Sequence, residues 1–391
     1  MKKSILVMLL LPFLSFAQDD LIKKVESNKS DSAKNKYRFT DKINLENTAV
    51  KNQGSSGTCW SYSTNSFLES EMARMGKKPV DIAEIYTARK VYEEKADNYV
   101  RMHGAVSWGD GGSCHDVINI FAKYGAVPQS VYNGLNYGTT KNKFGELQAI
   151  LKGMLDAIVR NPNGKLTPNW KRAFNAVLDV YLGEVPQEFS YNGKQYTPQD
   201  FAKKVVGINP ADYIELSSFN NVPYYKQTIL MVPDNWSWDK VYNVKMNDIT
   251  ETIDNALQMG YTVTWATDVS EKYFSWKNGV AFVPEKEWED MDEEEQKALF
   301  NGPNDERKIT AAIRQEAFDN YSTTDDHGMH IVGLATDQSG KEYYIVKNSW
   351  GEKNDYKGYM YVTKAYVKYK TTAILLHKAA VPSDIRSKLG I

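Results

Sequence analysis

The stretch KNQGSSGTCW, residues 51–60, contains the residue type best suited to attack a carbonyl carbon. The chain has two cysteines, Cys59 and Cys114, so Cys59 does not belong to a disulfide-rich framework. A thiol becomes a strong nucleophile when it ionises, and the free N–H groups at a helix N-terminus favour the thiolate. Residues 59–75 have the apolar spacing of a helix, and Thr58 is a suitable N-cap. We therefore predict that Cys59 is a nucleophile at the start of a helix.

Attack on a carbonyl creates an oxyanion, which needs hydrogen-bond donors. Gln53 offers a side-chain amide, and the backbone N–H of Cys59 offers a second donor. The small residues 54–57 allow the chain to fold back so that both donors converge. The thiol also needs a base held in place by a third group. His327 and His330 in DDHGMH are the candidates, and on an extended strand they point to opposite faces because three is an odd step.

These residues also have structural interpretations. Cys59 could be a buried structural thiol, or it could form a disulfide with Cys114, although a bridged thiol cannot act as a nucleophile. Cys114 itself is typical of a packed helix residue. DDHGMH could be a metal cluster, but two histidines and two aspartates on a strand lack a familiar ligand spacing. The sequence therefore predicts neither a metal nor an organic cofactor.

The elements that must position these residues follow from periodicity. Helices are predicted over 59–75, 115–124 and 249–260, and in pieces within 141–206. Strands are predicted within 223–246 and over 261–269, 330–337 and 342–350, and the acidic run 285–300 is predicted as a solvated surface insertion. Helices come first and strands later, which indicates an α+β protein with segregated lobes.

The sequence predicts four segments along the chain. Residues 1–17 have a basic start, a short apolar run and small residues before the end, as a cleaved signal peptide does. Residues 18–43 are charged and non-periodic, and they are predicted to be a flexible leader. We expect a mainly helical lobe over 44–240 and a strand-rich lobe over 241–391.

The bulk composition limits the classes of partner that the sequence predicts. The net charge of −1 and a pI near 6.6 give no electrostatic reason to expect nucleic-acid binding. The apolar run within 1–17 is too short to span a bilayer, and no later run is long enough, so no stable membrane span is expected. The mature protein is therefore predicted to be exported, either to the periplasm or out of the cell.

Three segments, VKNQGSSGTCW, DHGMHIVGL and YYIVKNSWG, resemble in this order the nucleophile, histidine and asparagine segments of papain-like cysteine peptidases. YLGEVPQEFSYNGKQYTPQDFAKKVV, MGYTVTWATDVSEKYFSWKNGV and the closing HKAAVPSDIRSKLGI resemble the bleomycin hydrolase and aminopeptidase C branch. The resemblance implies a two-lobed papain-like fold, a helical lobe plus a β-barrel-like lobe, with the active site in the cleft between them. It also implies a cysteine peptidase, most simply an aminopeptidase, acting on peptide or protein substrates through a thioester.

The resemblance implies a role for each matching residue. Cys59 attacks the scissile carbonyl, and His327 takes its proton and later protonates the leaving amine. Asn348 orients the imidazole, and Trp350 shields that hydrogen bond from water. Gln53 helps to form the oxyanion hole.

The segment DGGSCHDVINIFAKYGAVPQSVY resembles the one that holds the glycine pair bordering the substrate cleft. By this resemblance Gly111 and Gly112 let the substrate backbone lie close to the cleft wall. Members of the branch often assemble into hexamers, so a homo-oligomer is a further expectation.

The sequence also departs from the family pattern. Ser56 stands where secreted relatives carry a cysteine, and the segment before residue 44 is too short for their inhibitory prosegment. In the branch a C-terminal arm binds the free amine of the substrate, and the chain after VPSDIRSKLG is expected to lack most of it. The alternatives are therefore an endopeptidase, an acyl transferase using the same thiol, and a non-catalytic peptide-binding protein of the same shape.

Overall fold

The computed structural model describes residues 18–26, 37–161 and 164–391. The predicted signal peptide, residues 1–17, lies outside the described residues. The helices are α1 (Gln18–Glu26), α2 (Cys59–Arg74), α3 (Glu84–Arg101), α4 (Cys114–Tyr124), α5 (Gly145–Val159), α6 (Asn169–Leu182), α7 (Pro198–Phe201), α8 (Met246–Gln258), α9 (Glu293–Ala298), α10 (Ala311–Asp319), α11 (Lys364–Lys370) and α12 (Ser383–Leu389).

The strands fall into one large sheet and one hairpin, and most of them lie in the second half of the chain. They are β1 (Phe39–Asn44), β2 (Phe189–Tyr191), β3 (Lys194–Tyr196), β4 (Tyr213–Ser217), β5 (Lys226–Ile229), β6 (Lys240–Asn243), β7 (Val263–Thr267), β8 (Phe274–Ser275), β9 (Val280–Ala281), β10 (His327–Asp337), β11 (Glu342–Lys347), β12 (Tyr359–Thr363) and β13 (Thr371–His377).

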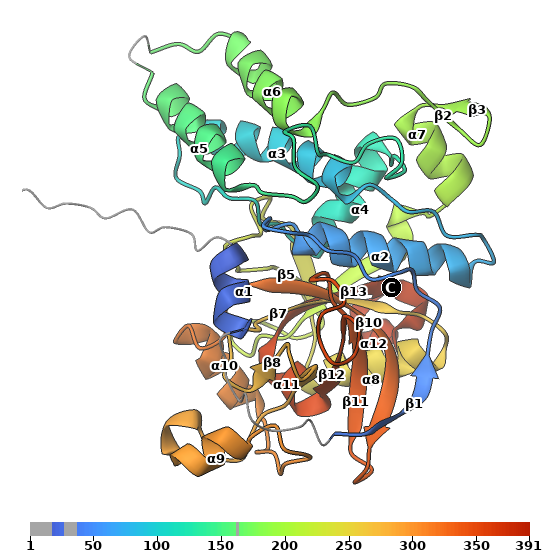
Figure 1. The fold of residues 1–391 in the computed structure, drawn as a ribbon, viewed down its shortest axis with the longest axis vertical. Coiled ribbons are helices and arrows are strands. Elements are labelled where there is room, and N and C mark those ends of the chain that lie inside the picture. The colour runs from blue at the N-terminus through green and yellow to red at the C-terminus, as the bar shows by residue number, and fades with distance from the viewer. Residues whose placement is uncertain (1–17, 27–36, 162–163) are drawn as a thin grey trace, which may run out of the picture.

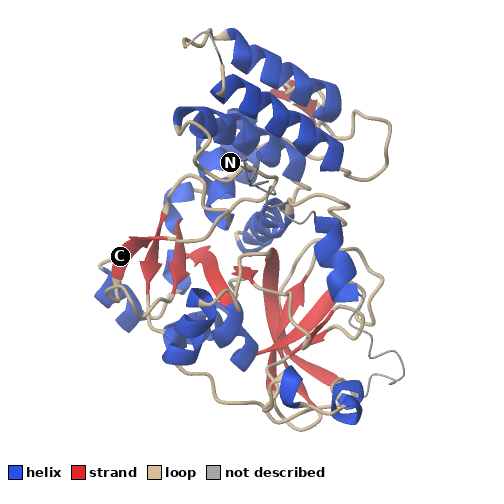
Figure 2. Ribbon diagram, turned by 90° about the vertical axis from the view of Figure 1, so that its left-hand side faces the viewer, coloured by secondary structure: helices blue, strands red, loops and turns tan. Residues whose placement is uncertain are grey.

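Two lobes make up the molecule, and Figures 1 and 2 show helices α3 to α7 gathered in one and the large sheet in the other. The sheet runs in the order β5-β6-β4-β13-β7-β10-β11-β12-β9-β8, and β1 pairs with β10. The long strand β10 pairs with β7 near its start, where His327 lies opposite Thr267, and with β1 near its end. On its other edge β10 pairs with β11, where His330 lies opposite Lys347.

Each lobe has its own hydrophobic core. The sheet lobe buries Trp265 and Tyr344, and the helical lobe buries Phe67 and Tyr92. Complete burial of one such side chain contributes about 1.5–3 kcal/mol. Helix α2 lies between the lobes (Figure 1) and packs against both α4 and β10. It is therefore buried on nearly all sides from Cys59 to Met72, polar residues included.

The prediction of a flexible leader over 18–43 is wrong for the described part of that span. Helix α1 buries Val25 in the sheet-lobe core, with Leu21 and Ile22 packed against the same core. In β1, Phe39 stacks on Tyr361 with ring centroids 3.7 Å apart. The few apolar residues among the charges are spaced so that they share one helix face, which a reading by charge alone overlooks.

The predicted boundary at residue 240 also differs from the structure. Strands β4, β5 and β6 all precede residue 244, yet they form one end of the large sheet, and β4 pairs with β13. The helical lobe therefore ends earlier than expected, near the end of α7 and the π-helical turn that follows it. This region was correctly predicted to contain strands and loops, but local sequence could not reveal that these strands pair with the end of the chain.

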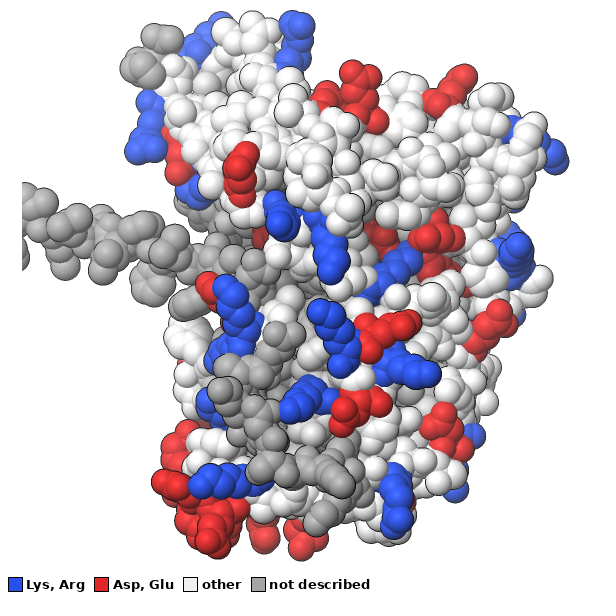
Figure 3. Space-filling view, viewed as in Figure 1, with Lys and Arg blue, Asp and Glu red and all other residues white. Residues whose placement is uncertain are grey.

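The acidic run 285–300 lies at the surface, as predicted. It contains α9, none of whose residues is buried, and Figure 3 shows a group of acidic side chains over α9 at the lower left of the view. Within the described ranges, no helix combines the length and the apolar character that crossing a membrane requires.

Candidate active site

Cys59 is the first residue of α2, as predicted, and its side chain is a free, buried thiol. Thr58 occupies the N-cap position, but its hydroxyl contacts Ser56 Oγ at 2.6 Å and caps no helical N–H. The backbone N–H groups of Gly328 and Trp60 lie near the Cys59 sulfur and act to lower the pKa of its thiol. The first turn of α2 and the start of β10 therefore meet at the thiol.

Gly328 makes this close contact between α2 and β10 possible. A Cβ atom at this position would lie 3.2 Å from the Cα atom of Trp60 and 3.0 Å from Ser63 Oγ. Without a side chain, β10 can approach the backbone of α2 directly. The preceding residue, His327, is thereby placed beside Cys59, and both residues line one small pocket.

The ring of His327 is held by Asn348, which follows β11. His327 Nε2 lies 2.8 Å from Asn348 Oδ1, and the backbone N–H of Ser349 donates to the same oxygen at 2.7 Å. Since that oxygen can only accept, Nε2 carries the ring hydrogen. His327 Nδ1 then presents a lone pair, and no described residue forms a hydrogen bond with it.

Trp350 covers this hydrogen bond, as the family resemblance implied. Its ring centroid lies 4.5 Å from that of His327, and only 6% of the tryptophan is exposed. The buried indole excludes water from the His327–Asn348 contact, which strengthens it.

Cys59 and His327 are both neutral in the free protein, although a helix N-terminus alone would favour the thiolate of Cys59. Burial raises the pKa of the Cys59 thiol, the N–H of Gly328 opposes that shift, and Asp234 and Asp325 raise the pKa further. Burial also lowers the pKa of His327 to about 4, against the opposing effect of its Asn348 hydrogen bond. In the free protein the neutral thiol and neutral imidazole are therefore favoured, because burial outweighs the helix terminus.

Gln53 is buried close to the same network, but part of its amide is already used. Its Nε2 donates to the carbonyl of Ser56 at 2.7 Å, and its Oε1 accepts from Ser349 Oγ at 2.5 Å. The loop 54–57 does fold back, and the fold-back brings Ser56 onto Gln53. Ser349 joins this loop to Asn348, a link that the sequence analysis missed because serine carries no distinctive motif.

The two rival candidates differ in position, because Cys114 lines the small pocket that holds Cys59 and His330 does not. His330 is fully buried, and its Nδ1 lies 3.0 Å from Ser66 Oγ on α2. It therefore faces the middle of α2 and not the thiol. Cys114 is a free, buried residue at the start of α4, as expected for a packed helix residue.

Gly111 lines a large cleft in front of Cys59 and Gly112 lines the small pocket that holds Cys59, but protein atoms already occupy the space beside both glycines. A Cβ atom on Gly111 would lie 2.1 Å from Asp234 Oδ2, and one on Gly112 would lie 2.9 Å from the Trp60 ring. The absence of a side chain at Gly111 therefore makes room for the carboxylate of Asp234. The family resemblance implied a substrate backbone in this place.

A cleft of about 1220 Å³ opens in front of Cys59, and carboxylates outnumber basic side chains along its walls. Asp234 and Asp325 line both this cleft and the small pocket that holds Cys59 and His327, and Glu215 lines the small pocket. None of these three acids was predicted as a substrate-binding residue from the sequence. Asp325 was within reach, because it stands two residues before His327 in a segment already singled out.

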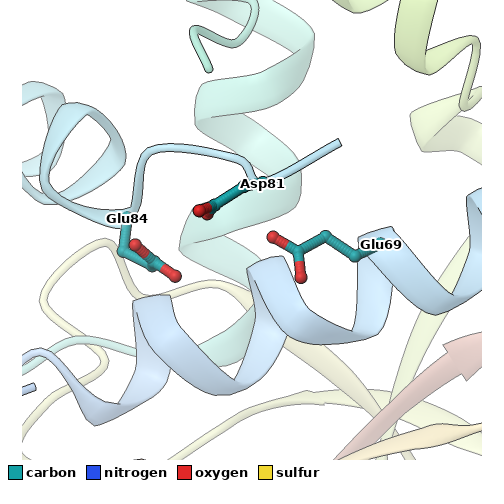
Figure 4. A group of neighbouring side chains, drawn as sticks. All are labelled: Glu69, Asp81 and Glu84. Carbon is teal, nitrogen blue, oxygen red and sulfur yellow. The ribbon is translucent and has the colours of Figure 1, made fainter. Parts of the chain in front are cut away.

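Three other carboxylates meet away from the thiol, at Glu69, Asp81 and Glu84 (Figure 4). Lys51 Nζ lies 3.2 Å from Glu69, 2.5 Å from Asp81 and 2.5 Å from Glu84. The ammonium group of Lys51 thus contacts all three carboxylates, as a bound metal ion would. The cluster anchors the segment before Gln53 to α2 and α3.

Comparison with known proteins gives relatives of one kind. The chain is 24% identical to aminopeptidase C of Listeria monocytogenes serovar 1/2a (strain ATCC BAA-679 / EGD-e), over 86% of this chain and 81% of the relative. It is 25% identical to aminopeptidase C of Lactobacillus delbrueckii subsp. lactis, over 89% and 83%. It is 23% identical to cysteine proteinase 1, mitochondrial, of Saccharomyces cerevisiae (strain YJM789), over 95% and 82%.

The fold is shared with a solved structure, that of PepW from Lactobacillus rhamnosis HN001. The TM-score is 0.70 at 21% identity, and the alignment covers 96% of this chain and 87% of the other. The predicted papain-like α+β fold is therefore confirmed. The sequence profile of the Peptidase C1-like family matches residues 14–390, and so this chain belongs to the Peptidase C1-like family.

Proposed function

We propose that the protein is a cysteine aminopeptidase that hydrolyses peptide bonds through a thioester. The observation that carries the proposal is the pairing of Cys59 and His327 in one pocket, with His327 Nε2 held by Asn348 and Nδ1 left with a lone pair. Family membership and relatives named aminopeptidase C support the same activity.

The geometry supports a role for each group. As the Cys59 sulfur bonds to the scissile carbonyl carbon, its proton passes to His327 Nδ1. The resulting imidazolium gives that proton to the leaving amine when the C–N bond breaks, and a thioester remains. Water then attacks the thioester with His327 as base, which releases the carboxylic acid and restores the thiol.

Stabilisation of the oxyanion is assigned to the N-terminus of α2 and to Gln53. An amide has two N–H groups, and Gln53 uses one of them for Ser56. Removal of an oxyanion donor of this kind typically lowers kcat by about 10²–10³-fold. We therefore expect Gln53→Ala to slow turnover while Cys59 still reacts with a thiol-directed epoxide.

The test compares wild type with Cys59→Ser on a fluorogenic alanyl amide. We expect steady turnover by wild type, none by Cys59→Ser, and epoxide labelling that mass spectrometry places on Cys59 alone. The matched control is Cys114→Ser, which removes the other buried thiol and should retain turnover. Robust turnover by Cys59→Ser would disprove the mechanism.

Two finer features belong to the same proposal. The signal-peptide pattern of residues 1–17 supports export to the periplasm or out of the cell. Assembly into a homo-oligomer, a hexamer by family resemblance, stays a prediction, and the mass of the purified protein in solution tests it.

A further inference from the structure

We propose that Asp234, Asp325 and Glu215 form a cation subsite beside Cys59, which binds an ammonium group of the substrate. The inference rests on the proposed peptidase function, and it names the chemical group that the cleft selects. The ammonium has two sources in a peptide, the free N-terminus and a lysine side chain.

The size of the pocket fits such a group. Asp234, Asp325 and Glu215 line it together with Cys59 and His327, and its volume is about 20 Å³. A cavity of this size accepts roughly one water-sized group. An ammonium fits these dimensions, whereas a further amino acid residue does not.

The three carboxylates have acceptor oxygens that the described protein leaves unsatisfied. No described residue donates a hydrogen bond to the carboxylate of Asp234. Asp325 receives a single long bond of 3.4 Å from Thr372. Glu215 is 6% exposed; its Oε2 contacts His115 at 2.5 Å, but its Oε1 has no partner among the described residues. Glu215 Oε1 is buried without a donor, which is costly, and the partly exposed carboxyls of Asp234 and Asp325 add acceptors beside it. The pocket is therefore complementary to a cationic donor.

The neighbouring acids of the cleft do not share this property. Asp326 accepts from the N–H of Val269 at 2.9 Å and from Ser270 Oγ at 2.5 Å. Asp268 accepts from the N–H of Ser270 at 2.8 Å and from that of Thr324 at 2.7 Å. These two acids shape the loop before β10, while the unsatisfied ones cluster at the thiol.

The cations already near the pocket do not complete it. Lys95 Nζ donates to the carbonyls of Gly109 and Gly111 at 3.1 and 2.9 Å, and it acts on Asp234 only through longer-range attraction. Burial lowers the pKa of His115, but Glu215, with Asp116 and Asp239, raises it to about 10, so a protonated His115 pairs with Glu215. No described cation forms an ion pair with Asp234 or Asp325, so both carboxyls are available to an ammonium of the substrate.

An ammonium bound here would also change the protonation of the pocket. Burial raises the pKa of both Asp234 and Asp325. A bound cation favours the ionised carboxylates and so displaces the proton that the free pocket retains. Binding of the ammonium is therefore accompanied by proton release.

The experiment measures kcat/KM of the full-length mature protein for matched pairs of fluorogenic substrates. The first pair is alanyl amide and N-acetylalanyl amide, which differ in the α-ammonium. The second pair is N-acetyl-lysyl-alanyl and N-acetyl-norleucyl-alanyl amide, which differ in the side-chain ammonium. The variants are Asp234→Asn and Asp325→Asn, and the control is Glu289→Gln, an exposed carboxylate that lines the same cleft.

We expect each Asp→Asn variant to lower kcat/KM for the cationic member of one pair by about 10- to 100-fold, the effect of losing a charged hydrogen bond. The neutral member of each pair reports any effect of the lost carboxyl on the thiol itself, and Glu289→Gln should keep the cationic-to-neutral ratio of wild type. A loss in the first pair assigns the subsite to the N-terminus, and a loss in the second assigns it to lysine. An unchanged cationic-to-neutral ratio in both variants overturns the proposal.

A binding measurement separates this proposal from the proposed function. Alaninamide should protect Cys59 from iodoacetamide better than N-acetylalaninamide does, and Asp234→Asn should abolish the difference. If wild type hydrolyses nothing yet shows this protection, the peptidase function fails and the subsite stands. If wild type hydrolyses peptides but neither ratio nor protection depends on the aspartates, the subsite fails alone.

Discussion

His327 separates its two tasks between its ring nitrogens. Nε2 is fixed by Asn348, so Nδ1 must exchange the proton with the thiol. Since proton transfer by a positioned base contributes about 10²–10⁴-fold, we expect His327→Ala to lower kcat by that factor. Steady-state kinetics measure the loss, with His103→Asn as the control. His103 is exposed and has a φ of 54°, which asparagine tolerates. A His327→Ala enzyme with normal kcat would contradict the assignment.

The ionisation of Asp325 makes the stability of the folded protein depend on pH. Burial and then Asp234 raise the pKa of Asp325 from 3.8 to about 8. Glu215 raises it as well, while Thr372 and His115 oppose the shift. The folded chain therefore holds a proton that the unfolded chain releases between about pH 4 and pH 8. This contribution to stability is fully present below about pH 4, and it is lost as pH rises through 8.

The Asp325→Asn variant removes this titration. We expect the difference in Tm, variant minus wild type, to increase by at least about 1–2 °C between pH 5 and pH 8. Thermal unfolding at a series of pH values measures it, and Glu289→Gln should show no such trend. A difference that stays flat or falls with pH would mean that Asp325 is ionised in the folded protein.

Helix α2 and strand β10 form the joint on which the site depends. Gly328 lets them touch, so Gly328→Ala must push β10 away from Trp60 and Ser63 or distort the first turn of α2. We expect a fall in kcat of at least about 10-fold, because small displacements of reacting groups are costly. Stability should fall as well.

The control for this substitution is Gly153→Ala. Gly153 lies inside α5, and a Cβ there would meet nothing within 4 Å. It should therefore leave kcat unchanged and raise stability by about 0.5–1 kcal/mol. Kinetics and thermal unfolding of both variants decide the matter, and full activity in Gly328→Ala would show that the close approach is not needed.

Local sequence predicts helix α2 better than it predicts the strands at one end of the large sheet. Helix α2 was predicted nearly to the residue, since Gly76 ends it and its apolar spacing is regular. The membership of β4, β5 and β6 in the large sheet was not predicted, because β4 pairs with β13 from the far end of the chain. Pairing over such distances depends on tertiary packing, which no local pattern records.

In the whole molecule, site residues that stand in sequence motifs were predicted, and those that depend on tertiary packing were not. Cys59, His327 and Asn348 stand in short motifs, and the structure brings them together from both lobes. Asp234 stands in no motif, and its place over Gly111 follows only from how the segment around β5 and β6 lies against the cleft. A residue that acts through burial and neighbours leaves no signature in its own segment.

The predicted export of the protein can be tested by determining the N-terminus of the mature chain. Cleavage after Ala17 would leave Gln18 as the first residue, and the mature chain would keep α1, which packs on the sheet lobe through Val25. We expect N-terminal sequencing of protein from the periplasm or the medium to begin at Gln18. Charge reversal of Lys2 and Lys3 to glutamate should hold the protein in the cytoplasm, because the basic start directs export.

The matched control is Lys23→Glu, which reverses an exposed charge in α1 beyond the cleavage point. It should be exported like wild type, so a loss of export confined to the Lys2 and Lys3 variant isolates the signal from net charge. Protein that stays in the cytoplasm and retains Met1 would instead place the enzyme in a reducing compartment. The free thiol of Cys59 would then need no protection from oxidation, whereas an exported enzyme should lose activity under oxidants and regain it with a reductant, as long as oxidation stops at the sulfenic acid.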